Sequence, residues 1–425
     1  MQTTTYGDFS ARLHQAFRGR RAPMEVSIEV THRCPLECRH CYNNLPMSDV
    51  NARKQELTLE EHVRLLDELV KMGTLWILYT GGEIFARKDF LDIYTEAKKR
   101  GFLITLFTNG TMITPRIADH LVQYRPFQIE ITLYGATRET YEALTQIPGS
   151  FDRCMKGIHL LLDRGLPLLL KTVPTSINVH EVYEMRRIAE ELGLEFKFDP
   201  LVNPRTDCSQ SPIAIRLTPE QAVTLEFRDP VRRAEYSKVI ESELCASLTP
   251  SSNRYTCGGG HNGCAIDPQG KMTICVLSHR DGYNIRSGSF REGWEGRLKD
   301  IRETKTTRQT ICTNCRITAL CSMCAANGEL EGGDAEQPVD FLCQVAHLRA
   351  FALGIAVPAH GDCACCAGGS QHSALRRSAE RINKDSVTLT NVVPLRPTSS
   401  NSLLPVLDSG AGCSAGGCSA CGAHR

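Results

Sequence analysis

The sequence predicts an α/β protein: a partial (β/α)6 barrel, followed by a small loop-rich domain held by metal and a Cys-rich mobile tail. Strand-length apolar segments alternate with amphipathic helical segments in the first half of the chain. The 20 cysteines are clumped instead of evenly spread. The 425 residues are enough for roughly two to three domains.

The alternation of strands and helices begins at Glu25. Residues 25–31 (EVSIEVT) alternate as a strand, and residues 58–72 form an amphipathic helix that starts with a capping box of Thr58 and Glu61. The same order then repeats, with strands predicted at 75–80, 102–107, 127–133, 167–173 and 195–199 and helices at 89–100, 115–123, 152–164 and 179–192. Such units call for a parallel sheet, so we expect an open, TIM-like barrel with its working loops at the carboxyl ends of the strands.

Changes in composition set the expected boundaries. The predicted parts are a lead segment (1–22), the barrel (23–215), a helical bridge (216–250), a cysteine-rich domain (251–350) and a tail (351–425). The tail shows no hydrophobic periodicity, so we expect it to be flexible. Its cysteines could bind another cluster, deliver metal or serve as thiols on a disordered arm; they are Cys363, Cys365, Cys366, Cys413, Cys418 and Cys421.

Charge and hydropathy exclude several classes of partner. The 49 basic and 48 acidic residues leave a formal charge of +1, which gives no electrostatic argument for nucleic acid or an anionic membrane. No apolar stretch approaches the roughly 20 residues that cross a bilayer, and no signal peptide is visible. We therefore expect a cytoplasmic protein with no nucleic-acid or membrane partner, whose thiols stay reduced and serve metal.

Three cysteines follow the first predicted strand. Cys34, Cys38 and Cys41 have the spacing C-x3-C-x2-C, and no fourth cysteine or histidine ligand follows at short range. Structural zinc normally has four protein ligands, so an open position favours a catalytic metal or a four-iron four-sulfur cluster with one free iron.

This arrangement resembles the radical S-adenosylmethionine (SAM) enzyme family. The resemblance implies that the free iron binds the amino and carboxylate groups of SAM, and that one electron cleaves SAM to a 5′-deoxyadenosyl radical that abstracts hydrogen. His40 stands where that family commonly has an aromatic residue, and Tyr42 supplies one just after the last cysteine.

Further strand ends carry candidate SAM contacts. Gly81 and Gly82 would let the backbone approach a ligand, and Glu83 could accept a hydrogen bond from an ammonium group. Thr80-Gly-Gly-Glu resembles the family's GGE motif, with Ile84 where proline is usual. Thr108 and Asn109 resemble the Thr-Asn-Gly often found near the cofactor, and Thr132 is a weaker candidate for a ribose contact.

Eight cysteines between residues 257 and 343 resemble the SPASM domain, the auxiliary-cluster extension of radical SAM enzymes that modify peptides and proteins. The resemblance implies two fully ligated 4Fe-4S clusters, the first held by Cys257, Cys264, Cys275 and Cys324 and the second by Cys312, Cys315, Cys321 and Cys343. Spacing alone does not distinguish them from two zinc sites. If Cys264 is not a ligand, the first auxiliary cluster keeps an open iron that could grip a substrate thiolate.

The resemblance implies an oxidoreductase with SAM and three 4Fe-4S clusters, acting on a ribosomally made peptide or a protein. It needs an external one-electron donor of the flavodoxin or ferredoxin type and could need a separate peptide-recognition protein. The enzymatic alternatives are a sulfatase maturase that forms formylglycine and a tetrapyrrole-modifying enzyme; the non-enzymatic one is a metal-binding scaffold. No catalytic base can be named, although Tyr134, Asp199 and Asp267 lie at suitable strand ends or loops.

Overall fold

The computed structural model describes residues 5–244, 252–278 and 280–388, without the side chains of 241–244 and 386–388. These residues form two compact units. The sheet unit comprises Arg20–Arg216 and Gly258–Glu303. The helical unit comprises the described parts of Met1–Gly19, Leu217–Cys257 and Thr304–Arg425.

A nine-stranded sheet forms the centre of the sheet unit, in the order β11-β10-β9-β1-β4-β5-β6-β7-β8. The six predicted strands are all present and pair in parallel, which confirms the fold class. They are β1 (Glu25–Glu29), β4 (Trp76–Thr80), β5 (Leu103–Thr108), β6 (Gln128–Thr132), β7 (Leu168–Thr172) and β8 (Glu195–Phe198). A two-stranded sheet of β2 (Arg33–Cys34) and β3 (Leu45–Pro46) follows β1. All six parallel strands therefore end at one edge of the sheet.

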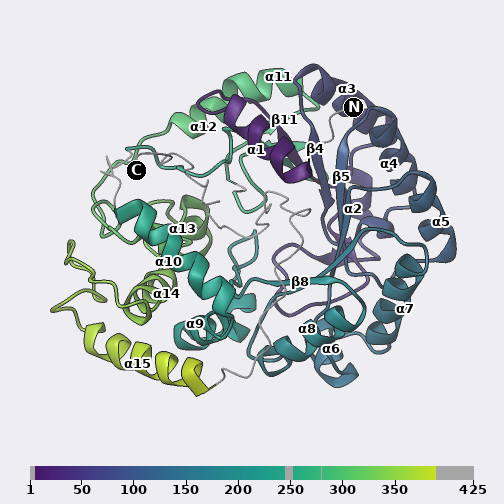
Figure 1. Ribbon diagram of the computed structural model, residues 1–425. Coiled ribbons are helices and arrows are strands. Elements are labelled where there is room, and N and C mark those ends of the chain that lie inside the picture. The colour runs from purple at the N-terminus through teal and green to yellow at the C-terminus, as the bar shows by residue number, and fades with distance from the viewer. Residues whose placement is uncertain (1–4, 245–251, 279, 389–425) are drawn as a thin grey trace. The chain divides into compact units, whose positions relative to one another are not determined.

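Helices cover the outer side of the parallel strands. Figure 1 shows α3, α4, α5 and α7 running outside β4 and β5. The helices are α2 (Val50–Gln55), α3 (Leu59–Lys71), α4 (Phe90–Lys99), α5 (Pro115–Gln123), α6 (Arg138–Thr145), α7 (Ser150–Leu162) and α8 (Val182–Glu191). The predicted capping box is confirmed, since Thr58 and Glu61 satisfy each other's backbone amides at the start of α3. α6 was not predicted from the sequence.

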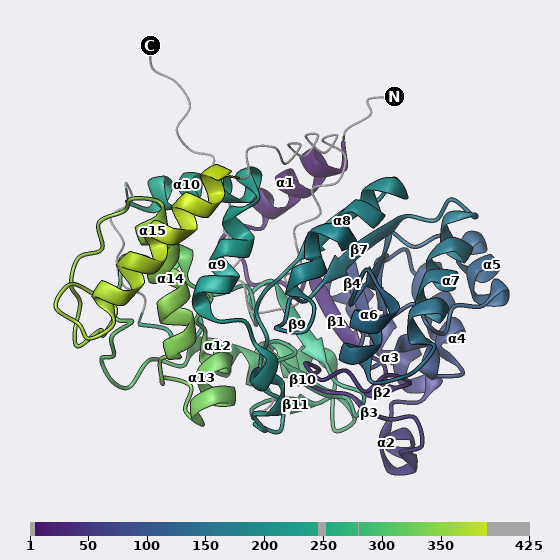
Figure 2. The same ribbon diagram turned by 90° about the horizontal axis from the view of Figure 1, so that it is seen from below.

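Three short strands from the cysteine-rich region extend the sheet beyond β1 (Figure 2). They are β9 (Gly263–Ile266), β10 (Lys271–Thr273) and β11 (Tyr283–Asn284), followed by α11 (Phe290–Gly293), a π-helical turn (Trp294–Leu298) and α12 (Lys299–Glu303). β9 pairs in parallel with β1, Glu25 opposite Gly263. Residues 258–303 thus group with the barrel, although the predicted boundary placed them in the domain that follows it. Hydrophobic periodicity does not reveal that β1 and β9, which lie far apart in the sequence, pair with each other.

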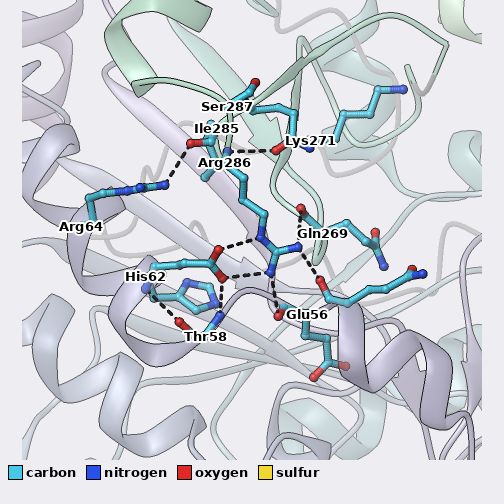
Figure 3. A network of polar contacts seen from close by, with 12 residues as sticks. Glu56, Thr58, His62, Arg64, Gln269, Lys271, Ile285, Arg286 and Ser287 are labelled. Carbon is cyan, nitrogen blue, oxygen red and sulfur yellow. Dashed lines mark hydrogen bonds and ion pairs between the residues drawn. The ribbon is translucent and has the colours of Figure 1, made fainter.

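Arg286 fastens this extension to the barrel helices (Figure 3). Its guanidinium donates to both carboxylate oxygens of Glu61, at 2.7 and 2.9 Å, and to the backbone carbonyl of Glu56 at 3.0 Å. Arg64 of α3 donates in return to the carbonyl of Ile285 at 3.0 Å. The hydrogen bond from Arg286 lowers the pKa of Glu61 to about 2, so this bidentate pair stays ionised at neutral pH.

The helical unit contains α1 (Tyr6–Ala16), α9 (Pro219–Phe227), α10 (Pro230–Leu244), α13 (Ala325–Gly332), α14 (Asp340–Ala352) and α15 (His372–Thr388). α9 and α10 occupy the predicted helical bridge, whose residues 245–250 lie outside the described part. α9, α14 and α15 pack against one another around a core that includes Phe227 and Leu348. Within it the carboxylate of Glu226 accepts two hydrogen bonds from the guanidinium of Arg349, at 2.9 and 2.7 Å.

The expectation of a flexible tail without regular structure is wrong for residues 372–388, which form α15. α15 buries Leu375, Ala379 and Ile382, which are spaced by four and three residues and so form one helical stripe. This stripe is narrow and the rest of α15 is strongly polar, so the average composition concealed it. The remainder of the predicted tail, with Cys413, Cys418 and Cys421, lies outside the described residues.

Candidate active site

The three predicted cluster ligands lie in the loop after β1. Cys34 ends β2 and is buried, while Cys38 and Cys41 are partly buried. The Cys34 sulfur accepts from the backbone amide of Leu36 at 3.4 Å and from the side-chain amide of Asn109 at 3.5 Å. The loop therefore offers three thiols, and one of them receives hydrogen bonds that would stabilise a thiolate.

The electrostatics of the loop suit thiols that ionise on binding metal. Burial raises the pKa of Cys34, Cys38 and Cys41, because a thiolate without a partner is costly away from water. Iron would provide that partner, as it does for the cysteine ligands of iron-sulfur clusters. The donor set of three sulfurs fits a four-iron cluster with one iron free of protein ligands.

Glu29, at the end of β1, supports the cysteine loop through side-chain hydrogen bonds. Its buried carboxylate accepts from the side-chain amide of Asn43 at 2.6 Å and the hydroxyl of Tyr42 at 3.3 Å, and lies 3.4 Å from the His32 ring. Asn43 in turn accepts from the Cys41 thiol at 3.6 Å. This role was not predicted from the sequence, although a carboxylate inside an otherwise strand-like segment was a visible signal.

Gly81 and Gly82 make the β4 loop fit against the cysteine loop. A Cβ on Gly81 would lie 2.2 Å from the carbonyl oxygen of Thr31, and a Cβ on Gly82 would lie 2.4 Å from that of His32. Gly81 also has φ +133°, which side chains rarely adopt. The amide of Gly82 donates to the Thr31 carbonyl at 2.7 Å. Here the glycines permit two backbones to meet; their approach to a ligand stays a prediction.

Glu83 joins two of the predicted motifs. Its side chain is 1% exposed and accepts from the Thr108 hydroxyl at 2.7 Å, the Asn109 amide at 2.8 Å and the Phe85 amide at 3.1 Å. Asn109 then reaches Cys34, so the candidate residues of β4 and β5 form one network with the cysteine loop. The carboxylate already has three donors inside the protein, and its acceptance from an ammonium group stays a prediction.

His40 takes the aromatic position within the cysteine motif. Its ring lies 5.1 Å from that of Tyr134, and burial lowers its pKa to about 4, so the ring is neutral at pH 7. Its Nδ1 atom is buried and has no hydrogen-bond partner among the described residues. Tyr42 instead turns toward Glu29, so His40 is the residue that can present an aromatic face here.

Thr132 lies on β6, the strand next to β5, which carries part of the Glu83 network. It ends β6 opposite Lys171 of β7 and is partly buried. Sequence reasoning missed Lys171, whose amine lies 3.1 Å from the Glu130 carboxylate and whose pKa burial lowers to about 8. An amine that gives up its proton near neutral pH is a candidate acid or base.

Two of the three residues considered as a base serve turns. Asp267 accepts from the amides of Gln269 and Lys271 in the β9–β10 turn, at 2.9 and 2.8 Å. Asp199 accepts from the amide of Leu201 at 3.0 Å. Both contacts are local side-chain caps of the backbone.

The second predicted auxiliary set gathers in the helical unit. The thiols of Cys312, Cys315 and Cys343 are close enough to raise the pKa of Cys321 electrostatically, although burial is the larger cause. The first set is divided: Cys257 and Cys324 belong to the helical unit, and Cys264 and Cys275 to the sheet unit. Both cluster assignments stay predictions.

A parallel open barrel with three cysteine thiols at the carboxyl edge of its strands defines an enzyme that works with a metal cluster. Residues 28–189 match the model of the radical SAM superfamily, and this segment contains all the predicted ligands of the first site. A domain of this kind binds SAM and a 4Fe-4S cluster, and the cysteine-rich region that follows fits the SPASM extension. None of the helices that the structure describes has the length and apolar character needed to cross a membrane.

Curated relatives cover most of the chain. The AdoMet-dependent heme synthase of Methanosarcina barkeri is 26% identical over 340 residues, 74% of this chain and 94% of that protein. The mycofactocin maturase MftC of Mycobacterium tuberculosis is 26% identical over 316 residues, 71% of this chain and 78% of that protein. The solved structure of Streptococcus suis SuiB bound to its precursor peptide SuiA has a TM-score of 0.57 at 16% identity, covering 77% of each chain.

Proposed function

We propose that this protein is a radical SAM peptide maturase, which oxidises a ribosomally made peptide. The observation that carries the proposal is that the chain has both a three-cysteine loop at the sheet edge and a further group of four cysteines in the helical unit. The likeness to a mycofactocin maturase supports it, as does the fold shared with SuiB, which binds a precursor peptide.

The chain's own residues would prepare the first site. Cys34, Cys38 and Cys41 would hold three irons of the cluster, and Asn109 would donate to the Cys34 sulfur. The Glu83 carboxylate keeps Asn109 in place by accepting a hydrogen bond from the Asn109 backbone amide. When bound and reduced by one electron, the cluster and SAM supply a radical that takes hydrogen from the substrate.

The auxiliary cysteines would complete the oxidation. An auxiliary cluster, when bound, would supply an electron acceptor, so that the peptide would lose one hydrogen as an atom and a second as a proton and an electron, two hydrogens in all. Cys312, Cys315, Cys321 and Cys343 are the group that would hold the second such cluster. An external flavodoxin- or ferredoxin-type donor would reduce the first cluster, and a separate protein would present the peptide.

Mass spectrometry of a candidate precursor peptide, co-expressed with the enzyme, tests the proposal. We expect a loss of two hydrogens that requires SAM. Alanine at Cys34, Cys38 and Cys41 should abolish SAM cleavage, whereas alanine at Cys312 should spare cleavage and stop product formation. Cleavage with an unchanged peptide mass for every neighbouring open reading frame would contradict the proposal.

A tetrapyrrole-modifying activity is the second candidate. It is favoured by the similarity to the heme synthase, which extends over 94% of that protein. Incubation of the reduced enzyme and SAM with a panel of carboxylated tetrapyrroles distinguishes the two. A tetrapyrrole product with no change in any peptide would favour this function over the peptide maturase.

A further inference from the structure

Four side chains that could bind metal meet in the helical unit, one from α14 and three from the segment where a flexible tail was expected. His347 of α14 and His360, Cys363 and Cys366 of the following loop place one ligand atom each within 4.8 Å of all the others, and all four are buried. Among the described residues, this group and an overlapping one are the sets of three or more His, Cys, Asp or Glu with that spacing. Histidine nitrogens and cysteine sulfurs are the usual ligands of zinc in proteins.

The separations match a single tetrahedral ion. Zinc–sulfur bonds of about 2.3 Å and zinc–nitrogen bonds of about 2.0 Å place sulfur and nitrogen ligands about 3.5 Å apart around a tetrahedron. His347 Nε2 lies 3.4 Å from the Cys366 sulfur and 3.8 Å from the Cys363 sulfur. The Cys366 sulfur lies 3.9 Å from His360 Nε2 and 3.3 Å from His360 Nδ1. The corner thiolates of a four-iron cluster surround a larger core, so this spacing favours one ion over a cluster.

Hydrogen bonds fix both imidazoles in the form that binds metal. His347 Nδ1 lies 2.8 Å from the backbone carbonyl of Cys343, and His360 Nδ1 lies 3.0 Å from that of Pro358. A carbonyl can only accept, so each Nδ1 carries the proton and each Nε2 presents a lone pair. Histidine ligands of metals are typically oriented by a hydrogen bond of this kind.

The overlapping group explains the geometry less well. It combines His347 and Cys363 with Cys343 and Cys365. Its Cys343 is also a predicted ligand of the second auxiliary cluster, and the Cys343 sulfur lies 3.7 Å from His347 Nδ1, which already donates to a carbonyl. The Cys366 sulfur approaches His360 Nδ1 in a similar way, at 3.3 Å, so this contact alone does not separate the two groups. The Cys365 thiol points instead to the side-chain oxygen of Gln371, at 3.5 Å.

We propose that His347, His360, Cys363 and Cys366 bind one Zn²⁺ ion. Four protein ligands and full burial make the site closed, as in structural zinc sites. The ion would fasten the loop before α15 to α14, which also carries Cys343 one turn before His347. It would therefore support the helix from which a predicted cluster ligand projects, without joining the cluster.

Metal analysis of the full-length protein, purified without oxygen, tests the site. We expect one zinc per chain in addition to iron. Cys366→Ser should lose the zinc and keep the iron. Cys365→Ser, which alters the neighbouring buried thiol, should keep both. Cys343→Ser should keep the zinc and lose iron if Cys343 serves a cluster, so that a failure of the proposed function is distinguishable from a failure of the zinc site.

Zinc-edge X-ray absorption on the wild-type protein needs no variant and decides the ligand set even if Cys366→Ser does not fold. Two sulfur and two nitrogen neighbours are expected. A protein without zinc, a shell of four sulfurs, or zinc that survives Cys366→Ser but not Cys365→Ser would overturn the proposal.

Discussion

Replacing Glu83 by alanine should destabilise the protein even before any cofactor binds. The carboxylate is buried and accepts from the backbone amides of Phe85 and Asn109 and from the hydroxyl of Thr108. The hydroxyl can rotate toward another acceptor, but the two amides cannot. Each buried donor left without an acceptor costs about 1–3 kcal/mol, so Glu83→Ala should lower the free energy of unfolding by about 2–6 kcal/mol.

Glu83→Gln should lower the free energy of unfolding by less than Glu83→Ala does. Glutamine keeps one acceptor oxygen and turns a donor amide toward the remaining protein donor, so one contact is lost, worth about 1–3 kcal/mol. Glu60→Gln, on the exposed face of α3, is a matched control that should change stability by less than about 1 kcal/mol.

Urea unfolding of the cluster-free protein, followed by circular dichroism, measures the three variants. The test separates two roles, because a carboxylate that only binds SAM would leave the stability of the cofactor-free protein unchanged. A loss below about 1 kcal/mol for Glu83→Ala would refute the scaffold role argued from its three hydrogen bonds.

Three further perturbations test other parts of the structure. Arg349→Met should cost about 3–5 kcal/mol in urea unfolding, because buried Glu226 loses its bidentate partner, and Glu226→Gln in the same chain should recover part of this loss. Burial lowers the pKa of His62 to about 3, so below pH 6.5 the histidine takes up a proton more readily in the unfolded chain than in the folded one. The free energy of unfolding should therefore fall as the pH is lowered, by about 2 kcal/mol between pH 7 and 5 from this residue. His62→Gln should flatten the pH dependence of stability by that amount, and an unchanged slope would contradict the assignment. Gly82→Ala should prevent normal iron loading because its Cβ would meet backbone at 2.4 Å, whereas Gly296→Ala, with open space around it, should load iron normally.

The barrel could be predicted from the sequence because its signals are local. Gly73 and Gly101 follow helices and adopt positive φ, so the strands β4 and β5 begin close to where the sequence placed them. The cysteine loop and the GGE segment follow strands whose carboxyl ends must share an edge. Local signals thus specified both the elements and the edge that holds the site.

Long-range partners could not be predicted in this way. The contact of Glu83 with Asn109 and the support of the cysteine loop by Glu29 depend on side-chain direction, which spacing does not give. His347 and Cys366 are separated by a turn-rich loop, and neither motif alone indicates a shared ion. In such cases two separate segments supply one site, and each segment looks ordinary by itself.

The parallel pairing of β1 with β9 affects how the chain can fold during synthesis. Residues 263–266 leave the ribosome long after residues 25–29, on the order of ten seconds or more at about 5–20 residues per second. Throughout that interval the amide and carbonyl groups along one side of β1 have no strand to bond with, and an open edge of this kind invites association between nascent chains. The predicted cluster loop, which follows β1, therefore lies beside an open sheet edge until β9 has been synthesised.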